Sequence, residues 1–168
     1  MNNKTIAAVA TPNAPGGIGI VRISGENALQ IAEKIFRPVS GNALYESKGY
    51  RAHFGNVYYN SEKIDEAVCL VFRAPASYTG EDVAEISCHG GLYITKRVLR
   101  AALDAGATPA EAGEFTKRAF VAGKVGLPQA ILALGDGQAA EALDDVGNLV
   151  GVVVGDAGAV HVLVLVGD

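Results

Sequence analysis

The order of apolar and polar residues predicts strands and helices that are interspersed along the first 128 residues. Apolar or alternating segments predict strands at residues 5–10, 20–23, 50–58, 67–72 and 83–88. Apolar residues at helical spacing predict helices at residues 26–36, 92–105 and 114–122. Because two of the strands read as a hairpin, we expect an α+β fold built on a small mixed or antiparallel sheet with two main helices.

Local residues set the expected ends and surroundings of three of these elements. Ser24 is a favourable N-cap for the helix at residues 26–36, and Gly106 is a favourable end for the helix at residues 92–105. The segment AVCLVF at residues 67–72 is continuously apolar. It therefore predicts a central strand that is buried on both faces.

The segment YTGEDVAEISCHGG at residues 78–91 predicts a turn, a strand and a glycine entry into a helix. Glu85 lies inside this strand, between the apolar Ala84 and Ile86. A carboxylate among apolar residues is unfavourable unless something pairs with it. Glu85 is therefore either a paired group or an exposed residue of an edge strand. A strand, a glycine turn and a helix start together make a favourable place to hold a ligand.

The glycine-rich loop at residues 11–19 lacks the common nucleotide-binding signatures. Gly17 and Gly19 are followed by Arg22, where a dinucleotide fingerprint requires a third glycine. No GxxxxGK[ST] phosphate loop occurs in the 168 residues. We expect that Gly17, and Gly90 further along, allow tight turns or a close approach of the backbone to a ligand.

The histidines and cysteines do not predict a catalytic or metal centre. His53, His89 and His161 are isolated from one another, and no pair has metal-ligand spacing. Cys88 and His89 are neighbours in an extended strand, where they point to opposite faces, which argues against a Cys–His catalytic pair. A lone His beside two glycines is more often a structural hydrogen-bonding residue than a ligand, so His89 is interpreted in this way. Cys69 and Cys88 lie in apolar segments, which predicts buried thiols rather than a disulfide.

Two parts of the chain differ in charge. All 14 Lys and Arg lie in residues 1–128, together with 12 of the 18 acidic residues. Residues 129–168 hold the other six acidic residues and no Lys or Arg. The sequence therefore changes character near Pro128, and the first part is not basic enough to argue for nucleic-acid binding by itself.

No segment predicts a secretion signal or a membrane span. The apolar residues 5–10 are too few for a signal peptide, and residues 149–166 are interrupted by Asp156 and His161. Together with two buried thiols, this pattern predicts a cytoplasmic protein without a membrane partner.

Three blocks of sequence carry a resemblance to a known family. They are ATPNAPGGIGIVRISG at residues 10–25, SYTGEDVAEISCHGG at residues 77–91 and AGEFTKRAFVAGK at residues 112–124. In order and spacing they resemble the N-terminal domain of the tRNA modification GTPases called MnmE or TrmE, over roughly residues 4–130. Ala112 stands where the family usually has proline, which is a minor departure.

The resemblance implies a fold and a function. The family's N-terminal domain looks like half of the tetrahydrofolate-binding domain of aminomethyltransferases, and it forms a homodimer. The dimer binds a reduced folate, 5-formyltetrahydrofolate or 5,10-methylenetetrahydrofolate, whose one-carbon unit is attached to C5 of the wobble uridine of certain tRNAs. An MnmG-like flavoprotein and tRNA are the implied partners.

The resemblance also assigns three folate-binding residues, which are Arg22, Glu85 and Lys124. A pterin presents an N3–H and a 2-amino group side by side, and the carboxylate of Glu85 can accept both in a charge-assisted fork. Arg22 and Lys124 are cations that suit the carbonyl, formyl or carboxylate oxygens of a folate. No residue is expected to be catalytic, and no metal ligand is expected within this domain.

The expected domain organisation is a folate-binding domain at residues 1–128 and an atypical tail at residues 129–168. The family's G domain, which would bind GTP, Mg²⁺ and K⁺, has no counterpart here, so the chain is not expected to be catalytic alone. The tail is rich in residues whose codons begin with G, which suggests a family gene read out of frame after about residue 130, or a garbled or designed end. The alternative is a real β-hairpin formed by the segments VGVVVG and AVHVLVLV within residues 150–166.

Two other functions fit the same residues. One is a structural dimerisation module that binds no folate. The other is a fragment of an aminomethyltransferase-like one-carbon enzyme, which the short length and the lack of an evident catalytic Asp make less favourable.

Overall fold

The computed structural model describes residues 4–12, 14, 16–134, 152–154 and 160–162. The chain forms two compact units, Met1–Glu111 and Ala112–Asp168. The strands of the first unit are β1 (Ile6–Val9), β2 (Ile18–Ser24), β3 (Phe36–Pro38), β4 (Arg51–Tyr59), β5 (Glu62–Phe72), β6 (Val83–His89) and β7 (Thr108–Pro109). Its helices are α1 (Ala28–Ile35), the short 3₁₀ helix η1 (Leu44–Glu46) and α2 (Leu92–Asp104).

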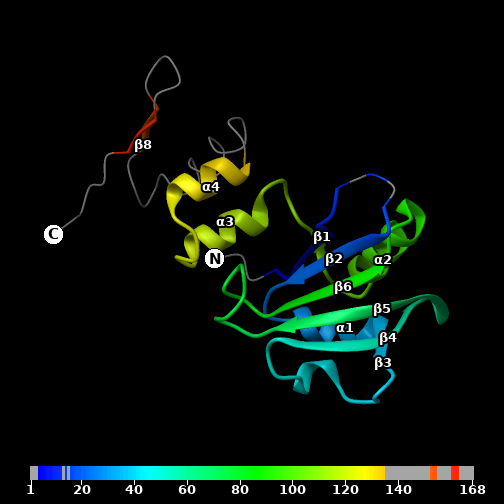
Figure 1. Cartoon of the computed structure of the whole chain (residues 1–168). Coiled ribbons are helices and arrows are strands. Elements are labelled where there is room, and N and C mark those ends of the chain that lie inside the picture. The colour runs from blue at the N-terminus through cyan, green and yellow to red at the C-terminus, as the bar shows by residue number, and fades with distance from the viewer. Residues whose placement is uncertain (1–3, 13, 15, 135–151, 155–159, 163–168) are drawn as a thin grey trace. The chain divides into compact units, whose positions relative to one another are not determined.

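The strands of the first unit form one seven-stranded sheet in the order β3-β4-β5-β6-β2-β1-β7 (Figure 1). All neighbouring strands are antiparallel except β1 and β7, which are parallel. The predicted hairpin is formed by β4 and β5, with a bulge between Val57 and Tyr58. The mixed sheet and its helices confirm the predicted α+β class.

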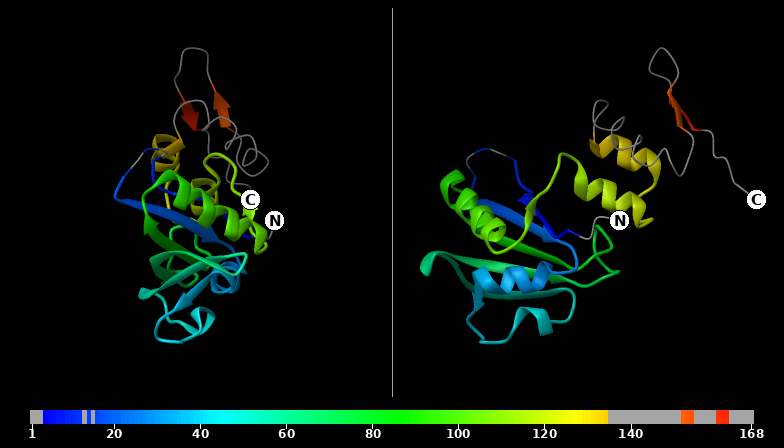
Figure 2. Two further views of the ribbon diagram at one scale, coloured as in Figure 1. Left: turned by 90° about the vertical axis from the view of Figure 1, so that its right-hand side faces the viewer. Right: turned by 180° about the vertical axis from the view of Figure 1, so that it is seen from behind.

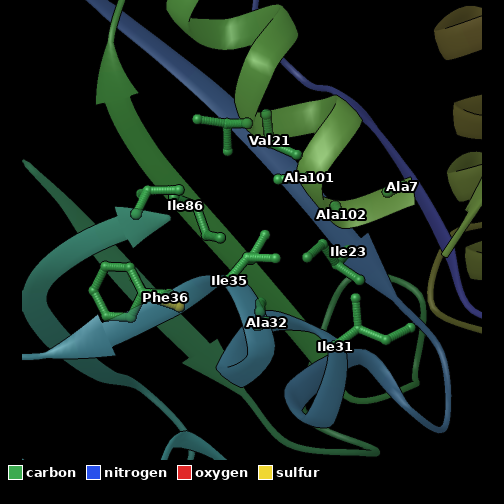
Figure 3. Packing of buried hydrophobic residues seen from close by; sticks show 14 of the residues in the cluster. Ala7, Val21, Ile23, Ile31, Ala32, Ile35, Phe36, Ile86, Ala101 and Ala102 are labelled. Carbon is green, nitrogen blue, oxygen red and sulfur yellow. The ribbon is translucent and has the colours of Figure 1, made fainter. Parts of the chain in front are cut away.

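Helices α1 and α2 cover the same face of this sheet, which we call the inner face (Figure 2). Figure 3 shows residues of α1 and α2 packed against strand residues of β2 and β6. Alternate strand residues point to this face because the side-chain period of a strand is two. The buried strand residues there include Val21, Ile23, Cys69, Val71, Ala84 and Ile86, and the helices contribute Leu29, Ile31, Ala32, Ile35, Val98, Ala101 and Ala102.

The opposite face of the sheet, which we call the outer face, corrects one prediction. Residues 67–72 do form a central strand, but that strand is not buried on both faces. Cys69 and Val71 are fully buried, whereas Val68 keeps 40% of its surface exposed. The first unit has helices on one face only, so an apolar side chain that points the other way has no helix of that unit to pack against.

Ser24 also departs from its predicted role. It is the last residue of β2 rather than a helix cap, and its side chain is completely buried. The helix begins at Ala28, two residues later than predicted, and Asn27 precedes it without a capping side-chain hydrogen bond. The predicted end of α2 is confirmed, because Gly106 follows the helix and has a φ of 120°.

The second unit contains helices α3 (Glu114–Val121) and α4 (Leu127–Leu134). Helix α3 confirms the helix predicted at residues 114–122. Strands β8 (Val152–Val154) and β9 (Val160–Val162) pair antiparallel, as the hairpin alternative for the tail predicts. Most of the predicted tail at residues 129–168 lies outside the described residues.

Candidate functional site

The candidate site begins with an ion pair between two central strands. Arg22 in β2 lies directly opposite Glu85 in β6, and its Nε donates to Oε1 of Glu85 at 2.7 Å. The two side chains are partly buried, with 25% and 18% of their surface exposed. Strand β6 lies between β5 and β2, so the interpretation of Glu85 as an edge-strand residue is wrong. The structure brings two of the three predicted site residues together.

The strand register places this ion pair on the outer face. Val21 and Ile86, the neighbours of Arg22 and Glu85, are buried on the inner face. Adjacent strand residues point to opposite faces, so Arg22 and Glu85 face away from α1 and α2. Leu70 of β5 lies opposite Glu85 and extends the same row of side chains across the sheet.

The next row on the outer face is mostly apolar. Val68 lies opposite Ser87 of β6 and opposite Phe54 of β4, which is 56% exposed. Ile20 of β2 completes the row opposite Ser87. The ion pair therefore borders a mostly apolar row that spans the four adjacent strands β4, β5, β6 and β2.

The loop between β5 and β6 folds over one end of the outer face. Ser24 belongs to this face, since it lies two residues from Arg22, and its Oγ donates to Oε2 of Glu81 at 2.7 Å. The hydroxyls of Ser24 and Thr79 also share a hydrogen bond of 2.7 Å, and Thr79 is 1% exposed. Two hydroxyls and a carboxylate thus attach the loop to the end of β2, next to the ion pair.

A second set of contacts fixes the ends of the same loop. Asp82 accepts from Nη1 of Arg73 at 2.7 Å and from the backbone N–H of Ala74 at 2.9 Å. The backbone N–H of Gly25 donates to the carbonyl of Asp82 at 3.0 Å. These bonds explain the position of the YTGED segment, whose Asp and Glu hold the loop against β2 and Arg73.

Tyr78 lies in this loop immediately before the buried Thr79. The guanidinium carbon of Arg22 is 5.6 Å from the centre of the Tyr78 ring, which is within cation–π range. The ring remains 42% exposed. Sequence reasoning singled out the segment that contains Tyr78 but did not include this residue in the site.

Lys124, the third predicted site residue, lies in the second unit. It is exposed and follows α3 in a turn toward α4. Its backbone N–H donates to the carbonyl of Ala119 at 2.8 Å, and the preceding Gly123 has a φ of 67°. These features end α3 in the manner of a glycine C-cap. The role of Lys124 toward a ligand stays a prediction.

The predicted ligand approach at Gly90 has another explanation. A Cβ added to Gly90 would lie 2.2 Å from the carbonyl oxygen of Gly16 and 2.5 Å from the backbone nitrogen of Ile18. The close approach at Gly90 is therefore made by the chain's own glycine-rich loop. An added Cβ at Gly17 meets nothing within 4 Å, so this position has the space that the prediction requires.

The histidine and the thiols near the site are structural. Asp65 accepts from the backbone N–H of His89 at 2.8 Å and lies 2.7 Å from its Nδ1, which confirms His89 as a hydrogen-bonding residue. Burial, and secondarily the charge of Glu85, raises the pKa of the Cys69 thiol to about 12. Burial also raises the pKa of Cys88. Both thiols are free and buried, and in this state they are poor nucleophiles.

The described part of the chain offers binding groups more readily than catalytic ones. It contains no group of three or more His, Cys, Asp or Glu that could hold a metal ion. It also contains no helix that is long and apolar enough to cross a membrane. The Arg22–Glu85 pair supplies a carboxylate acceptor and a cation on one exposed face, which suits a polar ligand with adjacent donors.

Residues 5–124 match the family described as the GTP-binding protein TrmE N-terminus. The chain belongs to this family. The TrmE-type match ends at Lys124 and contains Arg22, Glu85 and the whole of the seven-stranded sheet. Residues 125–168 lie outside the match.

Proteins named tRNA modification GTPase MnmE are similar to the same region. One from Symbiobacterium thermophilum is 54% identical over 131 residues, which is 77% of this chain and 29% of that protein. One from Chlorobaculum tepidum is 52% identical over 126 residues, covering 74% of this chain and 27% of that protein. One from Clostridioides difficile is 50% identical over 126 residues. The chain therefore spans less than a third of the length of these curated relatives.

Proposed function

We propose that this TrmE-type domain binds a reduced folate and forms a homodimer as part of an MnmE-like tRNA modification enzyme. The observation that carries the proposal is the carboxylate of Glu85, which Arg22 holds on the outer face of the sheet. In the whole enzyme, the folate would supply the one-carbon unit for the wobble uridine. The GTPase activity, and the binding of tRNA and an MnmG-like partner, would then belong to parts of the enzyme outside this domain.

The geometry of Glu85 suits the pterin head of a folate. Among the described residues, Arg22 is the one side chain that bonds Glu85, and it does so through Oε1. Oε2 and a second lone pair of Oε1 can then accept the N3–H and 2-amino group of a pterin as a parallel fork. Arg22 fixes the orientation of the carboxylate, so less side-chain entropy is lost when the ligand binds.

Calorimetric titration of the chain with 5-formyltetrahydrofolate tests this proposal. We expect saturable binding near one folate per protomer. Glu85→Ala should weaken the affinity at least about a hundredfold, because it removes a charge-assisted fork. Glu66→Ala is a matched control, since it removes an exposed carboxylate from β5, and it should leave the affinity unchanged.

Thermal unfolding of each variant shows whether the fold is retained. A folded parent chain that binds no reduced folate would contradict the folate assignment. Retained affinity in a folded Glu85→Ala variant would contradict the role of Glu85. Neither result bears on the dimerisation proposal, which is tested by a separate measurement.

The dimerisation proposal rests on the apolar part of the outer face. Phe54 and Val68 lie opposite each other across β4 and β5 and are 56% and 40% exposed. Exposed apolar residues that gather on a flat sheet are typical of protein–protein interfaces. A second copy of the chain is the proposed occupant, because an isologous contact places the same apolar surface on both sides.

The molecular mass in solution, measured by sedimentation, tests this interface. We expect a dimer for the parent chain and a monomer for Val68→Lys, because the substitution places a charge in the apolar surface. Lys63→Glu changes a charge on an exposed part of the same strand and should leave the mass unchanged. A dimeric Val68→Lys variant would contradict the proposed surface. A dimer without folate binding would favour the structural dimerisation module.

A further inference from the structure

Tyr78 and Glu85 approach Arg22 from two different elements. Glu85 accepts the Nε–H of Arg22 at 2.7 Å from β6, and the Tyr78 ring lies 5.6 Å from the guanidinium carbon on the loop that precedes β6. The three side chains therefore form one group on the outer face. Neither the sequence motif nor the resemblance assigns a role to Tyr78.

The loop holds the Tyr78 ring firmly beside the ion pair. The next residue, Thr79, is buried and shares a hydrogen bond with Ser24. The hydroxyl of Ser77, the residue before Tyr78, donates to the carbonyl of Glu81 at 2.5 Å. Both neighbours of Tyr78 are thus fixed by hydrogen bonds, and little freedom remains for its backbone.

An aromatic ring that is held in place and remains 42% exposed is available for contact with a flat ligand. We infer that Tyr78 is a ligand-contacting residue whose ring packs on the planar pyrimidinone part of the pterin that Glu85 binds. This inference rests on the proposed folate function. It predicts that the affinity for the folate depends on the aromatic ring of Tyr78 and not on its phenolic hydroxyl.

Substitutions of Tyr78 separate the ring from the hydroxyl. By titration with 5-formyltetrahydrofolate, Tyr78→Leu should raise the Kd about tenfold, because the stacked face is lost. Tyr78→Phe should stay within about twofold of the parent, because the ring is retained. Tyr93→Leu is the matched control, since Tyr93 of α2 is also exposed and also lies near an arginine, at 5.7 Å from Arg97. It should not change the Kd.

A spectroscopic readout adds a test that does not depend on loss of affinity. The chain has no tryptophan, so Tyr78→Trp introduces a single tryptophan, whose emission can be excited selectively, at the site. We expect its emission to change saturably with folate, at the midpoint found by calorimetry. Tyr93→Trp should show no saturable change.

The outcomes distinguish the two proposals. A folded parent chain that does not bind folate removes the proposed function, and the Tyr78 inference falls with it. If the parent binds and Tyr78→Leu keeps the parent Kd, the inference is overturned while the function stands. A Tyr78→Phe variant as weak as Tyr78→Leu would also overturn it, because the hydroxyl rather than the ring would then be required.

Discussion

The two faces of the seven-stranded sheet are made by the same strands but differ in what their side chains contact. The inner face packs on α1 and α2, and its residues such as Val71 and Ile86 are fully buried. The outer face carries the Arg22–Glu85 pair beside exposed apolar side chains. The inner face contributes mainly to stability, whereas the outer face holds the groups that we propose for recognition of a ligand and of a second copy.

A matched pair of substitutions in β5 gives the largest expected contrast between the faces. Val71→Ala removes buried methyl groups from the inner face and should lower the free energy of unfolding by about 2–3 kcal/mol. Val68→Ala makes the same change on the outer face. At concentrations where the chain is monomeric, it should cost less than about 1 kcal/mol, because the side chain is already 40% exposed.

Denaturant unfolding of both variants provides the measurement. The midpoint should shift for Val71→Ala while the dependence on denaturant concentration stays the same. Equal losses for the two variants would show that the outer face is packed as tightly as the inner face, and the comparison would fail.

Ser24 sharpens the comparison because it is an outer-face residue with a core-like environment. Ser24→Ala removes hydrogen bonds to Thr79 and Glu81 and leaves a buried hydroxyl with one partner fewer. The free energy of unfolding should fall by about 1–2 kcal/mol. Ser87 also lies on the outer face, in β6, and Ser87→Ala should change the free energy of unfolding by less than about 0.5 kcal/mol. A silent Ser24→Ala variant would mean that the loop does not depend on this attachment.

At neutral pH the titration of Cys69 has the smallest effect, because it changes stability only at alkaline pH. Its pKa rises from 9.0 to about 12 on folding, so the folded chain keeps a proton that the unfolded chain releases between these values. The contribution of Cys69 to the free energy of unfolding is therefore fully present below pH 9. It decreases as the pH rises toward 12, by up to about 1.4 kcal/mol per pH unit. Cys69→Ala should lack this component in urea unfolding at several pH values. Parallel pH profiles for the two proteins would contradict it.

The fold was largely predictable because the apolar periodicity of most elements matches the inner face. The helices at residues 92–105 and 114–122 and the β4–β5 hairpin follow from spacing and glycine positions alone. The burial of β5 was predicted wrongly because Val68 and its neighbours are apolar on both faces. A single sequence does not distinguish an apolar residue that is buried within a domain from one that faces outward.

The site was predictable only in part. Glu85 was recognisable as a polar residue within an apolar strand, and its partner Arg22 came from the resemblance rather than from the residues alone. Ser24 has the sequence context of a helix cap, and its contact with Thr79 spans 55 residues. Tyr78 was not recognised because the role that we propose for it depends on a loop position that hydrogen bonds to β2 determine.

The strand order has a consequence for how the site forms. Arg22 and Glu85 are 63 residues apart, and the segment between them supplies α1 and the β4–β5 hairpin. Joining β6 to β2 closes a long loop, so this non-local pairing carries an entropic cost. The Arg22–Glu85 pair exists only once β6 and β2 are joined. If a folate binds this pair as we propose, a concentration of about a hundred times its Kd would add about 2.7 kcal/mol to the stability of the assembled sheet.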